Sequence, residues 1–214
     1  MINKPDRWDT VESHADLVSA LAKLVAVFSL DASTGVSDPV ATAMIADVTK
    51  LLANAKDHAL HIMQAHDKLL PVFLFMSRTV TMIPFVLSDM PVDEDDRMLL
   101  ASGLNFVVTH APIDAYHFLT ERWFASVNPK DEATYQQMPS QHSDRIEGMF
   151  IRVATPLHSF VSIFKTIRDA AGKVVDLVQM MEFDDDTQSV TYNPLMRSLY
   201  TLSPNSDSTN YSIN

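Results

Sequence analysis

The sequence predicts an α+β fold, with a mainly antiparallel sheet of about six strands, an N-terminal helical hairpin and one further long helix packed on it. Three observations support this: helical periodicity in the first 66 residues, a central apolar stretch rich in β-branched and aromatic residues, and short alternating segments in the second half. With 47% apolar and 20% charged residues over 214 positions, the composition is that of an ordinary globular protein with a sizeable core.

A helix is predicted over residues 10–30, because large apolar residues recur there every three or four positions. These residues are Leu17, Leu21, Leu24 and Phe28. Asp9 and Glu12 have the spacing of a capping box at the start of this helix.

A second helix is predicted to begin at Asp38-Pro39, where the two residues suit an N-cap and a first helical position. Its apolar positions continue to Ile62. The two helices are expected to form an antiparallel hairpin within residues 1–66. The hairpin either covers one face of the sheet or projects from the domain and dimerises.

The stretch LLPVFLFMSRTVTMIPFVL at residues 69–87 is the longest apolar concentration in the chain. Arg78 near its middle and two prolines within it argue against a membrane helix. Its β-branched and aromatic residues favour two strands, over residues 70–76 and 79–87, that turn at Ser77-Arg78. Pro84 lacks a backbone N–H and is therefore expected at an edge or a bulge.

The rest of the chain is predicted to hold one helix over residues 93–109, which begins with the acidic run DEDDR, and four strands over residues 115–126, 145–154, 160–168 and 173–183. Asp169 to Gly172 is the expected hairpin turn between the last two strands. Residues 128–144 form a long polar loop, and a short helix is expected from Asn193 to Leu202. The predicted organisation is therefore a helical hairpin (1–66), a sheet domain (67–202) and a flexible tail (203–214).

Composition excludes several classes of function. The chain has no cysteine, which rules out disulfides, thiolate metal sites and cysteine nucleophiles. The formal net charge of -11 argues against direct binding of nucleic acid, which rests on a surplus of Lys and Arg. No signal peptide is visible, so a cytoplasmic location is expected, or the virion if the chain is encoded by a phage. No membrane association is expected.

The first candidate site combines Glu121 with His142, Asp144 and Glu147. Carboxylates and imidazoles that meet at the end of a strand can bind a divalent metal or act as an acid and base in hydrolysis. The same residues also have a structural interpretation, in which Asp144 pairs with Arg145 and Glu121 meets an arginine such as Arg152 across neighbouring strands.

The second candidate is a metal site of His58 and His61 on the second helix, with His66 further along. Residues three apart on a helix are neighbours, although the metal-binding spacing in HExxH is four. His66 falls with the apolar stripe of the helix and His61 lies away from it, so the three imidazoles are not expected to converge. No cofactor is predicted beyond a divalent metal at one of these two clusters.

No glycine-rich phosphate loop and no GxSxG nucleophile elbow is present. The segment SQHSDRIE at 140–147, followed by a strand and the hairpin TIRDAAGKVV, resembles small α+β proteins of bacteria and their phages. The favoured function is a non-enzymatic interaction or assembly protein that acts through an oligomeric interface, such as a phage-type accessory or structural component. Its expected partner is a second copy of the chain or another protein. The alternatives are a metal-dependent hydrolase and an acidic inhibitor that imitates nucleic acid through DEDD at 93–96 and DDD at 184–186.

Overall fold

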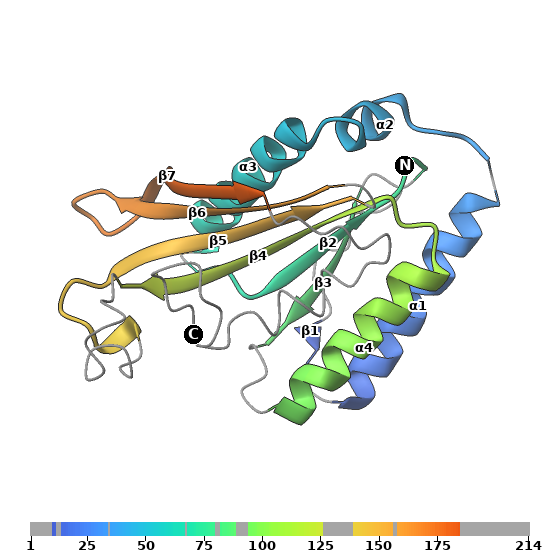
Figure 1. The fold of residues 1–214 in the computed structure, drawn as a ribbon, viewed down its shortest axis with the longest axis horizontal. Coiled ribbons are helices and arrows are strands. Elements are labelled where there is room, and N and C mark those ends of the chain that lie inside the picture. The colour runs from blue at the N-terminus through green and yellow to red at the C-terminus, as the bar shows by residue number, and fades with distance from the viewer. Residues whose placement is uncertain are drawn as a thin grey trace.

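A seven-stranded sheet organises the molecule (Figure 1). The computed structural model describes residues 10–11, 14–33, 35–66, 68–79, 82–88, 94–125, 139–155 and 158–184. The strand order is β1-β3-β2-β4-β5-β6-β7, and every neighbouring pair is antiparallel except β1 and β3. The strands are β1 (Thr10–Val11), β2 (Val72–Met76), β3 (Ile83–Leu87), β4 (Ala115–Phe124), β5 (Ile146–Ala154), β6 (Ser159–Arg168) and β7 (Val174–Asp184). The predicted α+β class and the six antiparallel strands are confirmed.

The helices are α1 (His14–Ala32), α2 (Pro39–Ile45), α3 (Val48–His66) and α4 (Glu94–His110), with a 3-10 turn, η1, at Pro139–Gln141. In Figure 1, α1 and α4 lie side by side on one face of the sheet, and α2 and α3 lie on the other. The helices therefore cover both faces of the sheet, whereas the sequence predicted a single covered face. The expected hairpin between the N-terminal helices does not form, because α1 packs against α4 instead.

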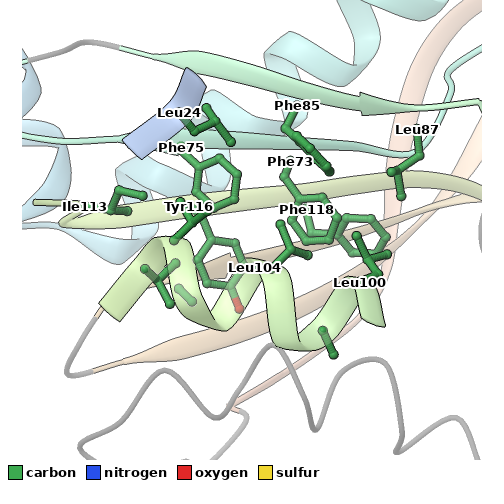
Figure 2. Close-up of a cluster of buried hydrophobic side chains, with 14 of the residues drawn as sticks. Leu24, Phe73, Phe75, Phe85, Leu87, Leu100, Leu104, Ile113, Tyr116 and Phe118 are labelled. Atoms are coloured by element: carbon green, nitrogen blue, oxygen red, sulfur yellow. The ribbon is translucent and has the colours of Figure 1, made fainter. Parts of the chain in front are cut away.

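Aromatic rings fill the core beneath α1 and α4 (Figure 2). Phe73 on β2 stacks on Phe118 of β4 with their ring centroids 4.4 Å apart. Leu24 of α1 and Leu104 of α4 close over these rings. Gly103 of α4 lies against the Leu21 side chain, so the absence of a side chain there lets the two helices approach closely.

A second core lies between α3 and the opposite face of the sheet. On α3 the buried residues are Leu51, Leu52, Ala55, Ala59 and Met63. They face aliphatic and methionine side chains of β2, β4 and β5, including Leu74, Leu119, Met149 and Ile151. The division into two cores follows from the alternation of side chains along each strand.

The second predicted helix is in fact two helices, because Asp47 begins a new one. The Asp47 carboxylate accepts hydrogen bonds from the backbone N–H groups of Thr49, at 3.0 Å, and Lys50, at 3.3 Å. A side-chain acceptor of this kind favours an N-cap over a helix interior. Asp38 caps α2 in the same way, as the sequence predicted.

The first helix also begins later than expected. Thr10 and Val11 pair in parallel with Val86 and Leu87, which makes them a short strand that the sequence did not predict. Pro84 lies opposite Leu74 of β2, and the pairing with β1 does not extend to it. The missing backbone N–H of Pro84 therefore interrupts no hydrogen bond between β3 and β1.

The β6–β7 hairpin turns at Asp169 to Gly172, as predicted. Two register shifts interrupt its pairing, between Ile163 and Phe164 and between Ile167 and Arg168. Gly172 has a φ of 82°, a left-handed conformation that favours glycine.

Several predictions fall outside the described residues: the Asp9–Glu12 cap, most of the loop at 128–144, the helix at 193–202 and the tail at 203–214. None of the described helices is long and apolar enough to cross a membrane.

Candidate functional site

Glu121, Glu147 and Arg168 meet on three neighbouring strands, β4, β5 and β6. Strand register brings them together: Glu147 lies opposite Trp123, two residues along β4 from Glu121, and β6 is the next strand of the sheet. The three side chains keep between 22% and 27% of their surface exposed. Alternation along the strands places them on the face that carries α3, beyond the apolar core.

Arg168 holds both carboxylates. Its Nε donates to both oxygens of Glu147 at 3.0 Å, and its Nη2 also donates to Glu147 Oε1. The same Nη2 lies 3.7 Å from Glu121 Oε1, while Nη1 donates to the Gly172 carbonyl at 2.8 Å. Glu121 Oε2 accepts the Leu69 backbone N–H at 3.3 Å. One guanidinium therefore links β4, β5 and the β6–β7 turn.

The two carboxyl groups have pKa values that move in opposite directions. Burial raises the pKa of Glu121, and a hydrogen bond with Glu147 and the charge of Glu147 raise it further. Hydrogen bonding to Arg168 lowers the pKa of Glu147, in spite of its partial burial. When two carboxyl groups share a site, the one that interacts less closely with the cation keeps its proton to higher pH. Glu121, 3.7 Å from Arg168, is therefore the carboxyl group of the pair that holds its proton more readily.

A hollow of about 380 Å³ opens beside these carboxylates. Glu121 and Glu147 line it together with Lys68, Trp123 and residues 69–71, which precede β2. Arg145 lies over the Trp123 ring, with its guanidinium carbon 5.1 Å from the ring centroid. Glu147 and Arg168 are hydrogen-bonded to one another, so Glu121, Glu147 and Arg168 together hold the ends of three strands in place. The two carboxylates also form a wall of the hollow.

His142 and Asp144 approach one another on the chain segment before β5. His142 is buried after η1, and its Nδ1 is 3.9 Å from Asp144 Oδ1. The ion pairs and hydrogen bonds of Glu121 and Glu147 do not include either residue. Within the described ranges, no group of three or more His, Asp or Glu side chains is arranged to hold a metal ion. The four residues predicted for a hydrolase therefore form two separate pairs.

The arginine that meets Glu121 is Arg168, where the sequence suggested Arg152. Arg152 points to the other face, lies opposite Phe118 and donates to the Ser159 hydroxyl at 3.1 Å. Arg145 donates to the Ser140 carbonyl at 3.0 Å, and Asp144 Oδ1 lies 3.9 Å from His142 Nδ1. Arg168 could not be identified from the sequence as the partner of Glu121, because the contact depends on the registers of both the β4–β5 and the β5–β6 pairs.

The two histidines predicted as weak metal candidates point in different directions. His61 is exposed on α3, whereas His58 is half-buried toward the sheet. The histidine that His58 approaches is His117 of β4, whose pKa the charge of His58 lowers. His117 shares a face of β4 with Leu119 and Glu121, and the sequence did not reveal that α3 covers this face.

Comparisons with protein-family models, with curated proteins and with solved structures found no match.

Proposed function

We propose that this chain is a non-enzymatic interaction protein that self-associates through the outer face of α1 and α4, as a structural or accessory component of an assembly. The observation that carries the proposal is the concentration of exposed apolar side chains on these two helices. Among the described residues they hold six of the twelve large apolar side chains that are exposed: Val18, Val27, Leu30, Met98, Leu99 and Phe106.

The composition of α1 supports a covered outer face. Only three of its 19 residues are charged, namely Asp16, Lys23 and Asp31. A helix that is apolar or small on nearly every side is typically covered on every side. The sheet and α4 cover Leu17, Leu21, Leu24 and Phe28, so the opposite side of α1 remains for a partner.

Residue spacing on that side suits a second helix. Ser19, Ala22, Ala26 and Ser29 are all exposed and recur at intervals of three, four and three, the spacing of a coiled-coil seam. Val18 and Leu30, 64% and 73% exposed, flank this seam. Small residues along the line of contact let two helix backbones approach closely.

A second copy of the chain is the occupant that these features favour. The same face on two subunits is self-complementary under two-fold symmetry. The formal net charge of -11 makes two copies of the chain repel one another in general. Because α1 carries few charged residues, two copies can meet at this helix with little repulsion.

Light scattering after size exclusion tests the proposal. The wild-type chain should give a mass that is a multiple of 23.9 kDa and does not change over a hundredfold dilution. Val18→Glu should reduce the mass to that of the monomer, because a carboxylate would be buried in the interface. Val40→Glu is the matched control, since Val40 on α2 is 63% exposed and Val18 is 64% exposed. A monomeric wild type, or equal dissociation by both variants, would overturn the proposal.

A further inference from the structure

Four enclosed polar atoms between α3 and the sheet have no hydrogen-bond partner within the described part of the chain. They are Asn54 Oδ1, His58 Nδ1 and both ring nitrogens of His117. Buried polar groups without partners cost stability, and a native chain seldom keeps several in one place unless a water molecule or an ion completes them. Their occurrence on neighbouring turns of α3 and on the strand beneath it therefore favours a bound water molecule or ion between the helix and the sheet.

His117 stands in the middle of an otherwise apolar layer and is 0% exposed. Across the sheet it lies opposite Leu74 of β2 and Val153 of β5. Ala115 and Leu119 precede and follow it on the same face of β4, which α3 covers. An imidazole contributes nothing here that a leucine would not contribute better, unless one of its ring nitrogens binds something.

The other two side chains come from α3. Asn54 and His58 are four residues apart, one turn along the same side of the helix. Both are half-buried, so this side of α3 connects His117 with the solvent. Burial and the nearby charge of His58 lower the pKa of His117 to about 3, and burial lowers the pKa of His58. Independently of these shifts, His58 Nδ1 and both ring nitrogens of His117 are buried without a hydrogen-bond partner among the described residues.

We propose that His58, His117 and Asn54 bind a divalent first-row transition metal ion such as Zn²⁺. Neutral imidazole nitrogens are preferred ligands of these ions, and the amide oxygen of Asn54 supplies a third donor. Water from the open side of α3 completes the coordination. Asp57 is next to His58 in the sequence, and its charge acts on His58, so it partly offsets the charge of the ion.

The test uses the full chain without a histidine tag, stripped with EDTA and melted with ZnCl₂, NiCl₂ or CoCl₂. At a hundred times the dissociation constant, Zn²⁺ should raise the Tm of the wild type by about 5–10 °C. His58→Gln and His117→Leu should each abolish this shift. His61→Gln is the matched control, because His61 is exposed one turn from His58 on the same helix, and it should keep the shift.

Two further measurements make the result decisive. Co²⁺ should give a visible absorption band in the wild type and in His61→Gln, and no such band in His58→Gln. In EDTA, His117→Leu should melt above the wild type, because it removes two unpartnered nitrogens from the core. If His117→Leu does not fold, His58→Gln alone decides the question. An unchanged wild-type Tm with every metal, or a shift that survives in His58→Gln, would overturn the proposal and leave bound water as the partner of these atoms.

Discussion

Arg168 of β6 binds the carboxylate of Glu147 on β5 through two guanidinium nitrogens. Its Nε donates to both carboxylate oxygens at 3.0 Å, and its Nη2 donates to one of them. Because Nη1 of the same guanidinium donates to the Gly172 carbonyl, the ion pair also anchors the turn that follows β6. Glu121 completes the group as the carboxyl that keeps its proton more readily. This arrangement gives two opposite predictions for its two carboxyl groups.

Glu147→Gln should lower the free energy of unfolding at pH 7 by about 2 kcal/mol, because it removes a carboxylate hydrogen-bonded to a partly buried arginine. The folded pKa of Glu147 lies below its ordinary value of 4.5, so its contribution is present above pH 4.5 and is lost as the pH falls through the folded pKa. Urea denaturation from pH 7 to pH 3 should show the difference from wild type shrinking in that acidic range. Glu182→Gln, which changes an exposed carboxylate of β7, should differ from wild type by less than about 0.5 kcal/mol.

Glu121→Gln should have the opposite effect and raise the Tm at pH 7. The folded pKa of Glu121 lies above 4.5, so the folded state holds this proton more tightly than the unfolded state does. Stability from this group is full below pH 4.5 and is lost as the pH rises through the folded pKa. Glutamine keeps an oxygen for the Leu69 N–H and carries no charge. The difference in Tm between Glu121→Gln and the wild type should vanish near pH 4. If Glu121→Gln instead melts below the wild type at pH 7, the attraction between Glu121 and Arg168 is larger than the cost of burying the Glu121 charge.

Gly148→Ala should destabilise the fold by about 2 kcal/mol. A Cβ at this position would lie 2.5 Å from the Phe164 carbonyl oxygen of the neighbouring strand and 2.8 Å from the Phe124 ring. The first of these atoms is backbone and cannot move without disturbing the β5–β6 pairing. Gly103→Ala is the contrast, since its Cβ would meet only the tip of the Leu21 side chain, and the gain in helix propensity offsets that contact. Thermal melts of both variants should separate them clearly.

Asp169→Ala should cost about 1–2 kcal/mol by loosening the β6–β7 turn. One oxygen of Asp169 accepts the backbone N–H groups of Ala171, at 2.8 Å, and Lys173, at 2.9 Å. Asp169→Asn retains an acceptor and should recover most of the loss. Hydrogen exchange of the β7 amides would localise the effect, and equal protection in both variants and the wild type would contradict it.

Local signals in the sequence account for most of the strands. The turn residues Asp169 and Gly172 and the alternation through β4 lie within a few positions of the structure they determine, so pattern reasoning located the strands from 115 onward closely. Even the break between α2 and α3 has a local signal in Asp47, which has the N-cap preference that the sequence analysis used for Asp38.

Long-range relationships were beyond such reasoning. The pairing of Glu121 with Arg168 joins residues 47 positions apart and depends on two strand registers at once. The placement of α1 and α3 on opposite faces depends on which apolar stripe fits which side of the sheet, and both stripes are similarly apolar. For the same reason the burial of His117 under α3 was not evident from its place in β4.

The two register shifts between β6 and β7 bear on how copies of this chain avoid one another. A regular outer strand offers a row of N–H and C=O groups to which an identical strand can attach, and repeated attachment leads to fibrils. Each irregularity in β7 displaces its ladder of donors and acceptors, so a second β7 cannot match it over any length. Growth at this end of the sheet is thereby discouraged, although Val175, Val178 and Met180 are exposed there. Under the proposed self-association, contact between copies would then be made by α1 and α4, where assembly can close after two subunits.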